Sequence, residues 1–126
     1  MESNSNEDSI LESVKSSLGI DETETSFDND IIICINTVFG ILNQLGIGTD
    51  DVFSINDKTT KWSEFMGNTN KYSMAKTYMN NRVRLMFDPP STQNLIDAMN
   101  ASISELESRM MLFSECKNEE VNMDGD

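Results

Sequence analysis

The chain contains no histidine among its 126 residues. This absence excludes the Ser-His-Asp and Cys-His forms of nucleophilic catalysis, and it removes the commonest protein ligand of transition metals. A phosphate-binding glycine loop is also missing, because Gly46, Gly48 and Gly67 lack the required spacing. No acid–base constellation stands out either. We therefore predict that the protein is not an enzyme and has no catalytic residues, no cofactor and no metal site.

Basic residues are scarce, since nine Lys and Arg stand against 22 Asp and Glu, a formal net charge of -13. Proteins that bind nucleic acid neutralise phosphates with Lys and Arg, so this charge disfavours such binding. A negative surface is still compatible with a wall past which DNA slides. The charges are also uneven: residues 1–30 hold nine acidic residues and one lysine, and residues 58–84 hold six basic residues and one glutamate. We interpret both as solvated faces of a bundle, or as patches that meet between successive copies in a ring.

Long apolar runs and cysteine motifs are absent too. Cys34 and Cys116 lie far apart without motif spacing, which indicates reduced thiols in a cytosolic compartment. The start, MESNSNEDS, has neither the basic nor the apolar region of a secretory signal. Glycines and amides interrupt the stretch from Ile31 to Gly48, which makes a membrane span improbable.

The segment 27–48 is the most apolar part of the chain, and residues 31–48 carry no charge. Its apolar residues recur at steps of four and three, which places them on one face of a helix; they are Ile31, Ile35, Val38, Leu42 and Leu45. We predict that this is the central core helix, with Asp28 as its N-cap, a Phe27–Ile32 staple and Gly46 at its end. Gly40 would let a neighbouring element approach closely.

Four further helices are predicted, over residues 9–18, 60–66, 71–87 and 91–115. An ordered loop held by Phe53 and Ile55 is predicted between the core helix and the helix at 60–66. The last helix has apolar residues at alternating steps of three and four, a coiled-coil-like seam; they are Ile96, Met99, Ile103, Leu106, Met110 and Phe113. The predicted fold is all-α: a small bundle of four to five helices with a long C-terminal helix and one ordered loop. We expect one domain over residues 9–116, between disordered acidic tails at 1–8 and 117–126.

An ordered set of short strings resembles the head–tail connector, or adaptor, proteins of tailed bacteriophages of the siphovirus type. The resemblance extends over residues 10–112. The strings that carry it are Leu18-Gly19-Ile20, Phe27-Asp28, Ile35-Asn36, Gln44-Leu45-Gly46, Trp62-Ser63-Glu64-Phe65 and Val83 through Pro90.

The resemblance implies a structural protein of the virion neck, present in the host cytoplasm during assembly. It implies a ring of twelve copies under the portal protein that extends the DNA channel and offers a surface to the tail or to a second connector, such as a stopper or terminator protein. Genomic DNA would pass without sequence-specific binding, and no membrane would be involved. The alternative, motivated by charge alone, is a small acidic cytosolic binding module that acts as a DNA mimic or as an inhibitor of a basic partner.

Candidate contact residues follow from the same resemblance, because the C-terminal helix or tail of these adaptors commonly contacts the portal. That points to Met110, Met111, Leu112 and Phe113, although these residues are equally suited to finishing the core. Trp62 and Phe65 are candidates for a subunit boundary, although a core anchor for their short helix is the favoured interpretation. Arg82 and Arg84 lie on different helix faces, and one of them is a candidate to pair with an acidic residue across the ring.

Overall fold

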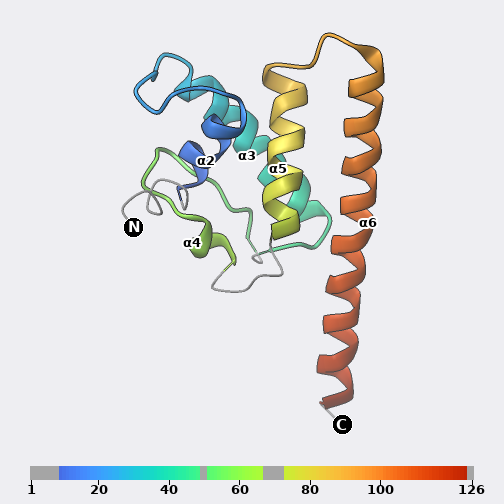
Figure 1. Ribbon diagram of the computed structural model, residues 1–126. Coiled ribbons are helices and arrows are strands. Elements are labelled where there is room, and N and C mark those ends of the chain that lie inside the picture. The colour runs from blue at the N-terminus through green and yellow to red at the C-terminus, as the bar shows by residue number, and fades with distance from the viewer. Residues whose placement is uncertain (1–8, 49–50, 67–72, 125–126) are drawn as a thin grey trace.

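The computed structural model describes residues 9–48, 51–66 and 73–124, and in the last helix it describes side chains as far as Leu112. Figure 1 shows its five helices: α2 (Ile10–Ser17), α3 (Asp28–Gln44), α4 (Trp62–Met66), α5 (Ser73–Phe87) and α6 (Gln93–Asp124). Helix α5 packs against α2, α3 and α6, and α2 also packs against α3. The described residues form no β-sheet. The predicted small all-α bundle is therefore confirmed.

Helix α2 begins and ends as its sequence predicts. The Ser9 hydroxyl accepts a hydrogen bond from the Glu12 amide at 3.3 Å, which satisfies one of the free donors of the first turn. At the other end Gly19 has a φ of 78°, and the Ile20 amide donates to the Lys15 carbonyl at 2.9 Å. This closing pattern needs a left-handed residue, which glycine supplies without strain.

Helix α3 supplies much of the core. Ile31, Ile35, Val38 and Leu42 are fully buried, while Leu45 follows the helix as its C-cap and is partly buried. The predicted Asp28 N-cap is wrong: Phe27 holds that position without a side-chain cap. The Asp28 carboxylate pairs instead with Lys15 at 2.9 Å. The predicted Phe27–Ile32 staple is not seen, and the Phe27 ring packs edge-on against Phe87, with centroids 5.7 Å apart.

The described part of the segment between α3 and α4, residues 45–48 and 51–61, is an ordered loop, as predicted. Asn36 on α3 holds it with two hydrogen bonds: the Asn36 side chain donates to the Ile55 carbonyl at 3.0 Å and accepts from the Ile55 amide at 2.8 Å. The later part of the loop is held by α2: the Ser9 hydroxyl donates to the Lys58 carbonyl, and the Ile10 amide donates to the Thr60 carbonyl. The loop is therefore fixed to both α2 and α3.

Helix α5 ends at Phe87, just before the two prolines, as the sequence predicts. Its buried residues are Ala75, Tyr78, Met79 and Val83. Met86, near the end of the helix, is exposed. Tyr78 is among the largest side chains that are fully buried.

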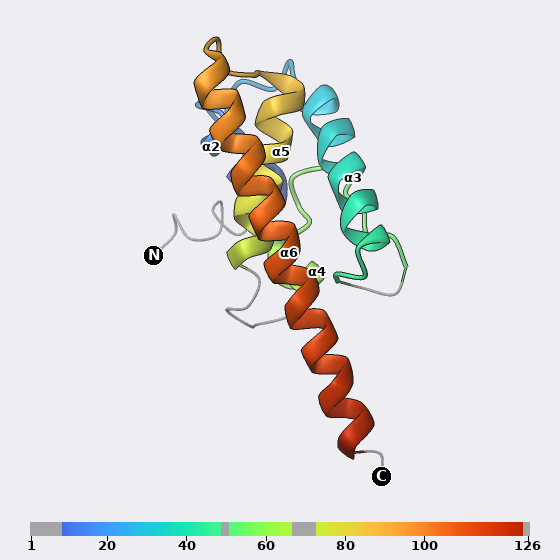
Figure 2. The ribbon, with the colours of Figure 1, turned by 90° about the vertical axis from the view of Figure 1, so that its right-hand side faces the viewer.

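Helix α6 is longer than predicted. It continues past Glu115 to Asp124, so most of the segment 117–126, predicted as a disordered tail, is helical. The other predicted tail, residues 1–8, lies outside the described residues. The 32 residues of α6 span ~48 Å at 1.5 Å per residue, whereas the 15 residues of α5 span only ~22 Å. Figure 2 shows the result: the C-terminal half of α6 projects beyond the other helices as an arm.

Candidate interaction surfaces

The C-terminal part of α6 presents apolar side chains to solvent. Met110 is the last described buried residue of the seam, but Met111 is 38% exposed and Leu112 is 61% exposed. The Phe113 side chain lies outside the described residues. Exposed apolar residues at the place where a helix leaves the body of a protein are typical of an interface. The sequence named this segment, and the structure separates it into one core residue and two surface residues.

A second uncovered apolar surface lies on the outer face of α3. Ile33 is 64% exposed, and Thr37 and Gln44 on the same face are also exposed. The predicted close approach of another element at Gly40 is wrong, because a Cβ placed there would meet no atom within 4 Å. We call Ile33, Thr37, Gly40 and Gln44 the outer face of α3. The sequence suggested a helix covered on most sides, but within the described part of the protomer this face is open.

Trp62 and Phe65, for which a core anchor is the favoured interpretation and a subunit boundary the alternative, lie in the core. Both rings belong to a cluster of tilted and edge-on aromatic contacts around Phe39 of α3, and the Phe39–Phe65 centroids are 4.8 Å apart. The Trp62 indole donates a hydrogen bond to the Ser13 hydroxyl at 2.9 Å, which joins α4 to α2. The structure therefore places them as core anchors. A subunit contact at either ring stays a prediction.

Arg82, one of the two predicted inter-subunit arginines, joins α5 to α6 within the protomer. Its guanidinium contacts Glu107 Oε2 at 2.8 Å and the Tyr78 hydroxyl at 3.0 Å, and that hydroxyl donates to the same carboxylate oxygen at 2.5 Å. Burial and the bond to Glu107 raise the pKa of Tyr78 to about 12. Burial alone would raise the pKa of Glu107, but the hydrogen bonds from Tyr78 and Arg82 outweigh it and lower that pKa below 4.5.

Arg84 serves the end of its own helix. Its side chain donates to the Asp88 carbonyl at 2.9 Å, close to the two prolines that follow α5. A cation at a helix C-terminus is favourable because the free carbonyls there carry partial negative charge. Any pairing of Arg84 across a ring stays a prediction.

Lys15 is a feature that sequence reasoning missed. Its side chain is fully buried beneath the acidic linker between α2 and α3. The ammonium group contacts Asp28 Oδ1 at 2.9 Å and donates to the Glu22 carbonyl at 3.3 Å. A buried cation must be paired, so this lysine holds the linker over the start of α3. The available signal was a lone lysine among nine acidic residues in 1–30.

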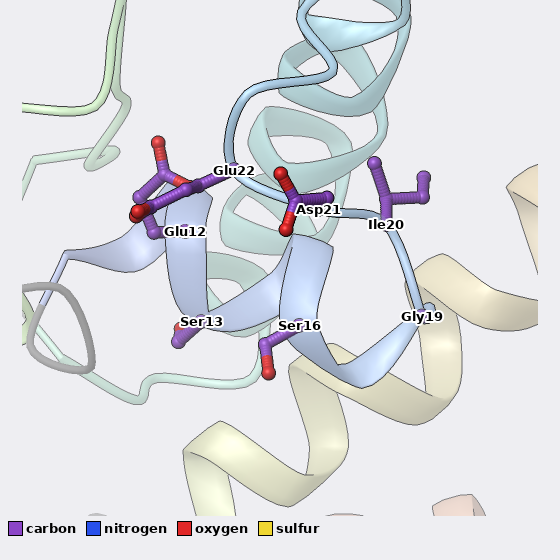
Figure 3. Close-up of a pocket in the computed structure, with 7 residues that line it drawn as sticks. All are labelled: Glu12, Ser13, Ser16, Gly19, Ile20, Asp21 and Glu22. Carbon is purple, nitrogen blue, oxygen red and sulfur yellow. The ribbon is translucent and has the colours of Figure 1, made fainter.

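An acidic groove lies beside that linker and was also not anticipated. Figure 3 shows its walls: the exposed side of α2 forms one, and the turn and linker after α2 form the other. The groove has a volume of about 640 Å³ and is lined by Glu12, Ser13, Ser16, Gly19, Ile20, Asp21 and Glu22. The Asp21 carboxylate accepts hydrogen bonds from the amide and hydroxyl of Thr23, which lower its pKa. Asp21 is therefore charged at neutral pH.

In the part of the chain that the structure describes, no three His, Cys, Asp or Glu residues are grouped in a way that would hold a metal ion. Across the same residues, no helix has the length and apolarity needed to cross a membrane.

One comparison with known proteins gives a match. A family model described as "Phage connector protein" matches residues 10–117, which includes α2 to α5 and most of α6. No curated protein and no solved structure matches the chain. The matched range contains both uncovered surfaces and the acidic groove.

Proposed function

We propose that this chain, which belongs to the phage connector protein family, forms a ring under the portal. Members of this family are structural proteins of the virion neck that act with portal and tail proteins. The ring would extend the DNA channel and offer a docking surface to the tail or to the next connector. We propose further that the α6 arm makes the portal contact and that the ring has twelve copies.

The arm of α6 is the observation that carries this proposal. The described buried residues of α6 end at Met110, and the helix then continues for a further 14 residues to Asp124. A helix that projects from its own domain with Met111 and Leu112 exposed has apolar surface free for a partner. This arrangement fits helix-in-groove recognition, in which an amphipathic helix places its apolar side into a groove of another protein.

Ring formation is supported by exposed apolar residues at two places outside the arm. The outer face of α3 is uncharged and carries the exposed Ile33, whereas the exposed Leu95 lies near the start of α6. Helix α5 packs against both of these helices and leaves their outer sides uncovered. Two different uncovered surfaces on one protomer suit a head-to-tail contact, which closes into a ring when the rotation between copies allows it.

The acidic balance supports passage of DNA through the ring. With a net charge of -13, a lumen lined by carboxylates would repel the duplex and prevent it from binding to the wall. The proposal requires that acidic residues face the lumen. It fails if the assembled ring has a basic lumen and keeps the acidic residues of the first 30 positions on its outside.

The test combines the protein with the portal protein of the same phage and measures the assembly by light scattering and negative-stain electron microscopy. We expect a ring of added density at one end of the portal. Leu112→Glu should abolish it, because the substitution puts a charge on the arm's apolar surface. Ala101→Glu is the matched control: it adds the same charge to an exposed position of α6, about three turns nearer the start of the helix. A wild-type protein that stays unbound beside a competent portal would overturn the proposal.

A further inference from the structure

We propose that the acidic groove between α2 and the linker binds a basic side chain, best an arginine, that a partner protein of the virion neck inserts. The inference rests on the proposed function for the identity of the partner. The groove itself is recognised by its charge and by one buried carboxylate.

Glu12 is the residue that marks the groove as a binding site. It is only 9% exposed, and its Oε1 atom is buried without a hydrogen-bond partner. A buried carboxylate oxygen without a partner is destabilising. The position of Glu12 in the first turn of α2 offsets part of that cost through the helix dipole. The unpaired oxygen of a residue that lines a groove is a ready acceptor for an incoming donor.

The charges around the groove favour a cation. Asp21 and Glu22 add carboxylates from the linker side, and the nearby cation, Lys15, is committed to Asp28 and to the Glu22 backbone. The Ser13 hydroxyl accepts a hydrogen bond from Trp62 and donates its proton to the Ile10 carbonyl, so it does not donate to Glu12. Glu12 thus gives the groove a buried acceptor oxygen that no donor of the protomer fills.

An arginine side chain suits this site better than a metal ion. The described residues contain no group of acidic side chains arranged to hold a metal. A guanidinium has five donors in a planar fork that matches carboxylates, and its aliphatic stem can reach a buried oxygen from the surface. A groove of about 640 Å³ is large enough to admit such a side chain.

The basic residues whose side chains the structure describes do not supply the occupant. Most of the described cations are engaged: Arg82 with Glu107, Arg109 with Glu105, and Lys76 over the Trp62 ring. The exposed Lys58 and Lys61 lie beside Ser9 at the start of α2, one turn from Glu12. Because they lie next to the groove, a second copy would present them most directly through a two-fold contact, which closes as a dimer and does not build a ring. A different protein with a basic surface is the matching partner.

The test measures the affinity of this protein for two probes, the portal protein and the tail-side connector of the same phage, in separate arms. Glu12→Gln removes the buried charge and keeps the shape of the side chain. Glu24→Gln is the control, since it removes one charge from the same linker outside the groove. We expect Glu12→Gln to raise the Kd for one of the two probes about tenfold or more, and Glu24→Gln to change it less than about twofold.

Two readouts separate a binding role of Glu12 from a structural one. The melting temperature of Glu12→Gln should equal or exceed that of the wild type, because an unpaired buried charge has been removed; a fall would mean that Glu12 stabilises the fold instead. In a third arm, an arginine-bearing hexapeptide should shift the carboxyl ¹³C resonance of Glu12 more than that of Glu24, and this arm needs no neck protein.

The outcomes also distinguish this inference from the proposed function. If the wild type docks on the portal and loses docking with Leu112→Glu, but Glu12→Gln behaves like Glu24→Gln with both neck proteins, the groove inference is overturned and the connector assignment stands. If the hexapeptide acts on Glu12 while the portal is not bound, the groove stands and the proposed docking does not. Equal shifts of Glu12 and Glu24 would also overturn the groove.

Discussion

Helices α3 and α6 are the two longest helices of the protein, and they are used in opposite ways. Helix α3 buries five of its 17 residues, and α2, α5 and the ordered loop contact it. Helix α6 has 32 residues, of which Ile103 and Met110 are buried among the described side chains. Its apolar residues, at steps of three and four, form a narrow seam, and the main contacts of the helix are with α5. The comparison indicates that α3 makes the fold and that α6 presents a surface.

The largest expected effect is a change at the centre of the α3 core. Phe39→Ala would remove the ring that contacts Phe53, Trp62 and Phe65, and large-to-small changes of this kind lower the free energy of unfolding by about 3–5 kcal/mol. Urea unfolding followed by circular dichroism measures it. Ile33→Ala on the outer face of the same helix is the control and should stay within about 0.5 kcal/mol of the wild type. Equal losses for the two variants would remove the distinction between the two faces of α3.

A second pair of variants compares Gly48, which lies against a core ring, with Gly40, which lies on the outer face of α3. Gly48 has a φ of 100°, and a Cβ there would lie 2.6 Å from the Phe65 ring. Gly48→Ala should therefore lower the free energy of unfolding by about 1–3 kcal/mol. Gly40→Ala adds a methyl group to open space on a helix and should raise that free energy by about 1 kcal/mol. Changes of the same sign in the two variants would contradict the structure.

The link between α5 and α6 should respond to pH. The pKa of Glu107 is lowered in the folded state, so its stabilisation is complete above the unfolded value of 4.5 and is lost as the pH falls through the folded value. Glu107→Gln should lower the free energy of unfolding by about 1–2 kcal/mol at pH 7, because partial exposure reduces the value of hydrogen bonds to a charged group. Thermal unfolding from pH 7 to 3 should show the gap between variant and wild type closing below pH 4.5. A gap that is constant across this range would mean that the Glu107 charge does not hold α6.

The smallest effect on stability is expected for the arm itself. Truncation after Leu112 removes helix beyond the last described buried residue of α6, so the free energy of unfolding should change by less than about 0.5 kcal/mol. Binding to the portal should be lost in the same variant. A large loss of stability would show that the arm belongs to the core and would end the contrast between α3 and α6.

The parts that were predictable from the sequence are those set by local pattern. The buried face of α3, the seam of α6 and the turns at Gly19 and Gly46 all follow from spacing within one segment. The end of α6 was misjudged because the acidic composition after Lys117 was interpreted as disorder. The sequence contains no proline or glycine between Ser91 and Gly125, and this was the signal for a continuous helix.

The candidate site was harder to predict because it depends on contacts between elements. Lys15 meets Asp28, and Arg82 meets Glu107, across 13 and 25 positions of the chain. Sequence spacing cannot pair such residues before the packing of the helices is known. The same holds for Glu12, whose burial follows from the linker that folds back beside α2. The resemblance to connectors indicated the arm, but it gave no hint of the groove.

The most direct test of the central claim is hydrogen exchange of the protein alone and in complex with the portal. If the arm is the portal contact, the amides of residues 111–124 should exchange quickly in the free protein and become protected in the complex, while the amides of α3 are protected in both. Unchanged exchange of residues 111–124 in a complex that has formed would exclude the arm as the contact, because it would show that the portal binds another part of the protein.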